Sequence, residues 1–363
     1  MSDAAGRDVE GARPVRDEDA FDIGAVASWL EGHADDRFRG DLVGTPEVRQ
    51  FSGGASNLTY LLRYAGRDLI LRRPPRGTKA RGAHDMAREY RIQRQLEPVF
   101  PYVPAMVGFC PDEGVIGADF YVMERIGGLV PRGDLAADVL TPEQAHQLCL
   151  TMIDVLVELH SVDPVAAGLG SLGKGLGYVR RQVDGWSTRY RNARTPDAPD
   201  FERVMAWLAA EQPDDVANCV IHNDFKLDNV VLDRADPTRV VGVLDWEMAT
   251  LGDPLMDLGG DLAFWIQADD DASLQQLRRV PTHLPGMLTR RELVERYCDR
   301  MGLWMTSERW RFYEIFGLFR LAVISQQIYY RYFHQQTTNE AFAVFGPSVQ
   351  IVGGRIEKLL GWA

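Results

Sequence analysis

The sequence predicts an α+β protein, with strands in the first third of the chain and helices in most of the remainder. Alternating apolar residues bounded by turn residues predict strands within residues 48–123. From residue 141 onward, apolar residues recur at the three- and four-residue spacing of amphipathic helices. Within this helical part, residues 221–247 contain two short apolar runs, each next to polar residues. The 363 residues are enough for two domains or lobes.

Composition and charge exclude several classes of protein. The chain is 45% hydrophobic and 25% charged, an ordinary composition for a globular protein. Its formal net charge of -12 disfavours a nucleic-acid or anionic-membrane partner, because both carry negative charge. No run of about eighteen apolar residues predicts a membrane span. The four cysteines form no Cys-x-x-Cys pair, so we expect reduced core thiols in a cytoplasmic protein. Residues 1–20 lack an apolar signal core and are expected to be a disordered tail.

The most informative stretch, residues 221–232, places polar residues before an apolar strand. Asp224 comes two residues after His222, Asn229 comes five residues after Asp224, and Asp245 ends a second apolar run. Phosphoryl transfer from Mg-ATP needs an acid that orients and deprotonates a hydroxyl, and hard oxygen ligands for magnesium. We therefore predict that Asp224 is catalytic and that Asn229 and Asp245 bind the metal. A β-hairpin with polar turns is the alternative.

This stretch resembles the catalytic loop of the aminoglycoside phosphotransferase and choline kinase-like family, which shares the fold of protein kinases. It fits the family pattern His-Gly-Asp-x-x-x-x-Asn, except that Asn223 stands in place of Gly. The resemblance implies ATP and Mg²⁺ as cofactors, with Lys226 offsetting charge on the transferred group and His222 anchoring the loop. It also implies a protein kinase-like two-lobed fold, with a small antiparallel-sheet lobe and a large, mainly helical lobe. The expected parts are a tail (1–20), a nucleotide-binding lobe (21–126) and a catalytic and substrate-binding lobe (127–363).

Two segments of the first lobe are expected to contact the nucleotide. A turn between two predicted strands contains small and polar residues that could cradle a phosphate: Ser52, Gly53, Gly54, Ser56 and Asn57. An ordinary hairpin turn is the alternative. The resemblance further implies a hinge at which backbone groups around Met123 and Arg125 meet the adenine edge.

The fold also requires a cation on the third strand that holds the α- and β-phosphates. The family usually has Lys there, whereas this chain offers Arg72, which can clamp a phosphate bidentately. Arg73 is the alternative. As the family pairs its strand cation with a helix acid, Glu89 is expected to pair with Arg72.

A Gly-dense loop at residues 168–177 precedes a predicted helix at 178–191. The loop is not a phosphate-binding loop, because it lacks Gly-Lys-Ser/Thr and follows a helix. The loop and the following Arg-Gln-x-x-x-Trp resemble one subgroup, the phosphotransferase domains associated with acyl-CoA dehydrogenases. Four residues of the helix are candidates for contact with a CoA substrate: Arg180, Arg181, Trp186 and Tyr190. A solvated helix with Trp186 in the core is the alternative.

Several positions around the motif have a supporting role or an open one. Residues 252–258 match the subgroup's Gly-x-Pro-x-x-Asp-Leu, so Asp257 is expected to brace the catalytic loop and Asp253 to cap a helix. Glu247 is either an acid near the magnesium or a solvent-facing one. A partly buried Arg320 needs a partner, for which we favour an internal acid over a substrate carboxylate or phosphate.

Taken together, these patterns predict an ATP- and Mg-dependent kinase that phosphorylates a hydroxyl of a small molecule. The subgroup resemblance favours a hydroxyacyl-CoA of acid catabolism as acceptor. An aminoglycoside, choline or another small alcohol is the alternative, as is a catalytically inactive nucleotide-binding protein. The joint presence of Asp224, Asn229 and Asp245 argues against the inactive protein.

Overall fold

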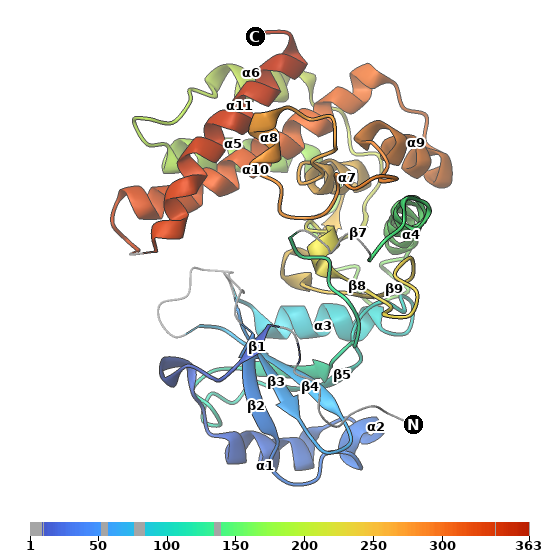
Figure 1. The fold of residues 1–363 in the computed structure, drawn as a ribbon, viewed down its shortest axis with the longest axis vertical. Helices are drawn as coiled ribbons and strands as arrows, with labels where there is room; N and C mark the ends of the chain where they lie inside the picture. Colours follow the sequence, from blue (N-terminus) through green and yellow to red (C-terminus); the bar gives the residue numbers. More distant parts are fainter. Residues whose placement is uncertain are drawn as a thin grey trace. The chain divides into compact units, whose positions relative to one another are not determined.

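The structure, a computed structural model, describes these residues of the chain: 9, 11–51, 57–75, 84–133, 139–337 and 339–362. They form two compact units, coloured along the sequence in Figure 1. The N-terminal unit contains the described residues up to Gly127 together with Leu244–Glu247, and the C-terminal unit contains the remainder. The prediction assigned residues 244–247 to the second lobe. They belong to the N-terminal unit because Trp246 is fully buried there, with its ring 5.9 Å from that of Phe100.

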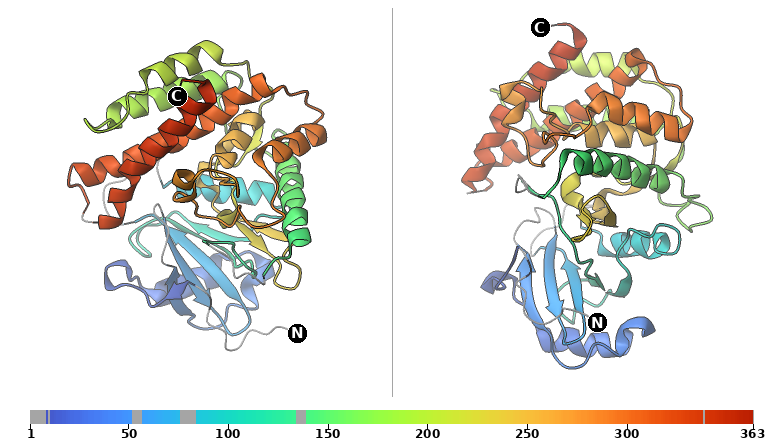
Figure 2. Two further views of the ribbon diagram at one scale, coloured as in Figure 1. Left: turned by 45° about the horizontal axis from the view of Figure 1, so that its top comes forward. Right: turned by 45° about the vertical axis from the view of Figure 1, so that its right-hand side comes forward.

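The N-terminal unit is built on a six-stranded antiparallel sheet in the order β1-β2-β3-β4-β6-β5. Its strands are β1 (Ala12–Arg13), β2 (Glu47–Phe51), β3 (Leu58–Arg63), β4 (Asp68–Arg73), β5 (Met106–Cys110) and β6 (Phe120–Glu124). Its helices are η1 (Asp17–Asp19), α1 (Ile23–His33), α2 (Asp36–Arg39) and α3 (Met86–Leu96). Because side chains alternate along a strand, Leu62 packs in one core with Leu30 of α1, and Leu61 packs in another with Met86 of α3. Both faces of the sheet are therefore covered (Figure 2).

Residues 11–20 have a defined structure, whereas the prediction placed residues 1–20 in a disordered tail. Strand β1 pairs with β2, and Asp19 is buried. The Gln50 side chain donates to Asp19 Oδ2 at 2.8 Å, and Tyr60 Oη donates to the Asp19 carbonyl at 2.9 Å. These partners lie in β2 and β3, far along the chain, so the local sequence pattern did not reveal them.

The C-terminal unit is mainly helical. Its helices are α4 (Pro142–His160), α5 (Tyr178–Ala193), α6 (Glu202–Glu211), α7 (Pro254–Leu262), α8 (Ala272–Gln275), α9 (Arg290–Met301), α10 (Ser307–Phe333) and α11 (Phe345–Leu360). Short 3-10 turns are η2 (Leu227–Asn229), η3 (Trp246–Met248, which straddles the two units) and η4 (Glu340–Val344). Two small antiparallel sheets pair β7 (Cys219–Ile221) with β10 (Thr250–Gly252), and β8 (Val230–Leu232) with β9 (Val240–Val243). A capping box of Thr141 and Gln144 begins α4. None of the described helices is both long and apolar enough to cross a bilayer.

Helices α7 and α10 cross with their backbones in contact. A Cβ atom on Gly317 would lie 2.0 Å from the carbonyl oxygen of Gly259, and one on Gly259 would lie 2.5 Å from the carbonyl oxygen of Tyr313. Only glycine permits so close an approach. The crossing holds α7 and α10 together, and both helices carry side chains that contact the segment after β7.

Candidate active site

In the N-terminal unit, Arg72 on β4 lies among three carboxylates, which we call the Arg72 cluster. Its guanidinium is 3.1 Å from Asp245, 3.8 Å from Glu89 and 3.8 Å from Glu247. The side chain is buried. Burial opposes its charge, but Tyr121 and the three acids raise the pKa of Arg72 above its ordinary value. A fixed cation therefore stands at the position predicted to hold phosphates.

Arg73, the alternative phosphate-binding cation, points into the other face of the sheet. It is 1% exposed and donates to the carbonyl of Asp19 at 2.6 Å and to Tyr60 Oη at 3.0 Å. It also lies 5.7 Å from the ring of Phe21. These contacts tie the segment before α1 to the sheet. Of the two arginines, Arg72 is the one that accompanies the acids.

Glu89 on α3 is held by neutral donors as well as by Arg72. Asn57 Nδ2 donates to Glu89 Oε1 at 2.8 Å, and Tyr121 Oη donates to Oε2 at 2.9 Å. Burial raises the pKa of Glu89, and the charge of Arg72 opposes that shift. Asn57 also donates to Glu247 at 3.2 Å, so Glu247 belongs to the cluster and is not a solvent-facing acid.

The other predicted nucleotide contacts have mixed outcomes. Four residues of the predicted phosphate-cradling turn lie outside the described residues: Ser52, Gly53, Gly54 and Ser56. Met123 is buried in the core beside α3. The backbone N–H of Arg125 donates to the carbonyl of Asp68 at 3.2 Å. The contact of backbone groups around Met123 and Arg125 with the adenine edge stays a prediction.

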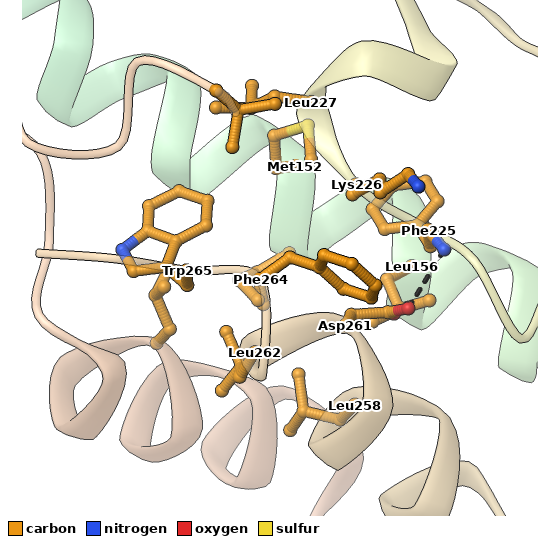
Figure 3. A pocket seen from close by; sticks show the side chains of 13 residues that line it. Met152, Leu156, Phe225, Lys226, Leu227, Leu258, Asp261, Leu262, Phe264 and Trp265 are labelled. Carbon is orange, nitrogen blue, oxygen red and sulfur yellow. Dashed lines mark hydrogen bonds between the residues drawn. The ribbon is translucent and has the colours of Figure 1, made fainter. Parts of the chain in front are cut away.

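In the C-terminal unit, the loop after β7 holds Asp224 between two donors, which we call the Asp224 cluster. Asn229 Nδ2 donates to Asp224 Oδ2 at 2.7 Å and to its backbone carbonyl at 2.9 Å. Lys226 Nζ lies 3.1 Å from Asp224 Oδ1. The stem of Lys226 places Nζ 4.7 Å from the centre of the Phe264 ring, and both residues appear in Figure 3. Each oxygen of the Asp224 carboxylate therefore has a partner that fixes its position.

The backbone just before Asp224 has an unusual conformation. Asn223 has a φ of 65°, in the left-handed region that glycine adopts most readily and asparagine next. This explains why Asn can stand where the family pattern has Gly. The Asn223 side chain is fixed on both sides, because Tyr178 Oη donates to its Oδ1 at 3.1 Å and its Nδ2 donates to the carbonyl of Met248 at 3.1 Å. Asp245 is also left-handed, with a φ of 66°.

Asp257 on α7 supports this loop from the helix. Its carboxylate accepts hydrogen bonds from the backbone N–H groups of His222 at 2.8 Å and Asn223 at 2.6 Å. His160 Nε2 lies 3.1 Å from Asp257 Oδ2, and its Nδ1 lies 2.6 Å from Tyr297 Oη. Burial would raise the pKa of Asp257, but His160 and the backbone hold it below its ordinary value. The loop that carries Asp224 is therefore anchored to a buried carboxylate.

A family model described as the phosphotransferase enzyme family matches residues 47–293, a span that contains both clusters. The chain belongs to this phosphotransferase family. A Ralstonia eutropha protein assigned to the aminoglycoside phosphotransferases is 29% identical in sequence to this chain. Its crystal structure matches this structure with a TM-score of 0.77, and the match covers 93% of this chain and 99% of that chain. APH(2")-IIa, solved as a ternary complex with streptomycin and ATP, is 16% identical in sequence to this chain. The two structures match with a TM-score of 0.54 over 86% of this chain and 93% of that chain. That second likeness supports the fold alone.

Curated relatives of this phosphotransferase are longer proteins. Acyl-CoA dehydrogenase family member 10 of Mus musculus is 35% identical over 323 residues, which make up 89% of this chain and 30% of the relative. Acyl-CoA dehydrogenase family member 11 of Homo sapiens is 31% identical over 331 residues, or 91% of this chain and 42% of the relative. The chain therefore spans less than half the length of these relatives. The predicted family, its kinase-like α+β fold and its phosphotransferase class are confirmed.

The two predicted metal ligands, Asn229 in the C-terminal unit and Asp245 in the N-terminal unit, each keep an oxygen of the kind that magnesium binds. The Asn229 amino group is used by Asp224, which leaves its amide oxygen as the possible ligand atom. Asp245 Oδ1 is paired with Arg72, which leaves Oδ2. Magnesium commonly takes one or two protein oxygens and completes its shell with phosphates and water. The part of the chain that the structure describes contains no group of three or more acidic, His or Cys residues able to hold a metal ion. Magnesium binding through Asn229 and Asp245 therefore stays a prediction.

The helix predicted to contact CoA, α5, is mostly engaged within its own unit. Tyr190 is 1% exposed and its hydroxyl donates to the carbonyl of Pro199 at 2.5 Å, so it is a core residue and the prediction of substrate contact is wrong. Arg181 donates to two carbonyls of the Gly-dense loop, each at 2.6 Å. The carboxylate of Asp215 accepts the first two N–H groups of α5, which places a negative charge where a phosphate would bind.

Arg180 and Trp186 complete the predicted set on α5. Arg180 is exposed. Trp186 is buried, as in the alternative reading, and its indole N–H donates to Gln182 at 3.1 Å. Two guanidinium groups lie near its ring, that of Arg189 at 4.6 Å and that of Arg320 at 5.5 Å. Of the four predicted substrate residues, only Arg180 and Trp186 therefore remain candidates.

Sequence reasoning missed Asp261, which lies one helical turn after Asp257 on α7. Its Oδ1 accepts the backbone N–H of Phe225 at 2.8 Å, drawn as a dashed line in Figure 3. Its Oδ2 is buried and has no hydrogen-bond partner among the described residues. Asp261 also lines an apolar cavity of about 30 Å³. Burial and the charges of Asp257 and Asp224 raise its pKa well above the ordinary value. The sequence did contain a signal for Asp261, since it is a second acid four residues after Asp257 in an otherwise apolar helix.

Replacing Asp261 with Asn should stabilise the protein increasingly as the pH rises. The folded state retains the Asp261 proton to a higher pH than the unfolded chain. The protonated Asp261 side chain therefore contributes its full stabilisation below about pH 4, and this stabilisation is lost as the pH rises through the raised pKa of the folded state. Asn resembles the protonated acid and does not titrate. The difference in melting temperature between Asp261→Asn and wild type should grow as the pH rises above about 4, the ordinary pKa of Asp. A constant difference across this range would contradict the assignment of a neutral carboxyl.

Proposed function

We propose that this phosphotransferase transfers the γ-phosphate of ATP to a hydroxyl of a small molecule, in a magnesium-dependent reaction. The observation that carries the proposal is the Asp224 cluster, in which Asn229 and Lys226 fix the two oxygens of one carboxylate. A general base must be held in a defined position to reach the proton that it removes. An inactive nucleotide-binding protein would have no use for this arrangement.

In this mechanism Asp224 orients the acceptor hydroxyl and takes its proton as the oxygen attacks phosphorus. Lys226 offsets the negative charge on the transferred group, and His222 helps to hold the loop, since its Nδ1 accepts the N–H of Asp224 at 3.3 Å. Arg72, positioned by Glu89, holds the α- and β-phosphates. Magnesium, when bound through Asn229 and Asp245, would supply charge neutralisation of the phosphates.

For the acceptor we propose a hydroxyacyl-CoA of acid catabolism. The proposal is supported by the curated relatives, which are named as members of the acyl-CoA dehydrogenase family. An aminoglycoside is the second candidate, supported by the likeness to the Ralstonia eutropha structure. We keep the cytoplasm as the proposed location, because all four cysteines are free.

The test is a screen for ATP-dependent phosphorylation of several acceptors. Purified protein with Mg-ATP would be incubated with hydroxyacyl-CoAs, free hydroxy acids, aminoglycosides and choline, and phosphorylated products would be identified by mass spectrometry. We expect a phosphorylated hydroxyacyl-CoA whose formation stops when the metal is chelated. Phosphorylation of aminoglycosides alone would overturn the acceptor, and the absence of every phosphorylated product would overturn the kinase proposal.

A further inference from the structure

Arg320 on α10 is a buried cation that lacks a carboxylate partner. It is 8% exposed, and its Nη2 donates to the carbonyl of Asn223 at 2.6 Å. Within the described part of the chain it makes no ion pair and no other hydrogen bond. The internal acid favoured as its partner by the sequence analysis is therefore not found. A guanidinium has five N–H donors, so most of its hydrogen-bonding capacity is unused by these residues.

The acid Asp261, whose pKa is influenced by Arg320, does not form an ion pair with it. The charge of Arg320 lowers the pKa of Asp261, but burial and the charges of Asp257 and Asp224 outweigh it and raise that pKa well above its ordinary value, which favours the neutral carboxyl. A buried charge without a charged or well-bonded partner is unfavourable. The site around Arg320 therefore favours an additional anion or strong hydrogen-bond acceptor.

The surroundings of Arg320 place this unused capacity beside the catalytic loop. Asn223, whose carbonyl accepts the bond from Arg320, is joined by a peptide bond to Asp224. On α7, Gly260 leaves room for the guanidinium, because a Cβ atom there would lie 2.6 Å from Arg320 Nη1. On α5, the ring of Trp186 lies 5.5 Å from the guanidinium carbon. Three elements of the C-terminal unit thus hold the cation next to the residue that carries the base.

We propose that Arg320 binds a carboxylate or carbonyl oxygen of the acceptor molecule. The inference rests on the proposed function, in which the acceptor hydroxyl meets Asp224. Arg320 donates to the carbonyl of Asn223, the residue before Asp224, so we expect an acceptor that reaches both groups to carry its carbonyl or carboxylate near its hydroxyl. The acceptor is then a hydroxy acid or its thioester. A polycationic alcohol is disfavoured, because Arg320 repels it.

The experiment measures acceptor binding without ATP, by isothermal titration calorimetry on the full chain. The three probes are β-hydroxybutanoate, its CoA thioester and the matching neutral diol. Wild type should bind the first two more tightly than the diol. Arg320→Met should weaken binding of the carboxylate and the thioester by about 10- to 100-fold and leave binding of the diol unchanged. Arg320→Lys should recover part of the loss, since it restores the charge but not the planar fork.

Arg331→Met is the matched control, because Arg331 is an exposed arginine on the same helix and its removal should change none of the three affinities. An equal loss for all three probes in Arg320→Met would mean that Arg320 only supports the loop through Asn223, and would overturn the proposal. Failure of wild type to bind both the carboxylate and the thioester would also overturn it. Since no turnover is needed, these results are independent of whether the proposed kinase reaction occurs. Phosphorylation of the diol as efficiently as of the acid would overturn the inference and leave the kinase proposal intact.

Discussion

Replacing Asp224 with Asn should lower the rate of phosphoryl transfer by about 100- to 10,000-fold, the usual contribution of a positioned general base. Asn has the shape of Asp but cannot take up the hydroxyl proton. The loop should persist, because the backbone carbonyl of residue 224 still accepts from Asn229 and Asp257 still holds the preceding N–H groups. The measurement is kcat for ATP consumption with the best acceptor from the screen, together with the melting temperature.

Asp236→Asn provides the matched control for this variant. Asp236 lies in the turn between β8 and β9, is exposed, and loses the same unit of charge on substitution. Its kcat should equal that of wild type. If Asp224→Asn retained wild-type turnover, Asp224 would not be the base. If Asp224→Asn lost turnover and also showed a large fall in melting temperature, the lost turnover would reflect unfolding. The kcat of Asp224→Glu would then be compared with that of wild type instead.

The sequence predicted most accurately the features whose signals are local. Helix α3, from Met86 to Leu96, has such a signal, because its apolar spacing lies within eleven residues. The capping box of α4 needs only Thr141 and its neighbour three residues on. The loop from His222 to Asn229 was also readable, since one short segment contains both Asp224 and its amide donor.

Contacts between distant segments were not predictable in this way. Asn57 and Glu247 are 190 residues apart in the chain, and Arg320 and Asn223 are 97 residues apart. No periodicity reports such a pairing, so Glu247 was left between two roles and Arg320 was given the wrong partner. The order of residues 11–20 has the same origin, because Asp19 is held by residues of β2, β3 and β4.

The choice between Arg72 and Arg73 illustrates what the sheet adds to the sequence. Neighbouring residues of a strand point to opposite faces, so only one of the two arginines can meet Glu89. The sequence cannot say which face carries the acids. In the structure the acids of the Arg72 cluster come from α3 and from the segment at 244–247, while the partners of Arg73 are Asp19 and Tyr60.

We expect Arg72→Met to abolish the stabilisation of the protein by Mg-ATP. Without the guanidinium, three carboxylates of the cluster face one another without a counter-charge, and the phosphates lose their cation. Removing one partner of a buried charged group costs about 3–5 kcal/mol, so the unliganded protein should also be less stable. The measurement is the melting temperature with and without saturating Mg-ATP, since a ligand that binds only the folded state raises it. Arg72→Lys should retain part of the shift, because Lys supplies the charge as a single point.

Arg73→Met separates the nucleotide effect from the loss of stability. Arg73 is fully buried and bonded to the Asp19 carbonyl and Tyr60, so its removal should also lower the melting temperature of the unliganded protein. The upward shift produced by Mg-ATP should nevertheless remain as large as in wild type, because Arg73 lies on the face of β4 away from the acids. If the shift were lost in Arg73→Met and kept in Arg72→Met, the phosphate-binding cation would be Arg73. The three carboxylates around Arg72 would then serve to fold the N-terminal unit and not to position a nucleotide.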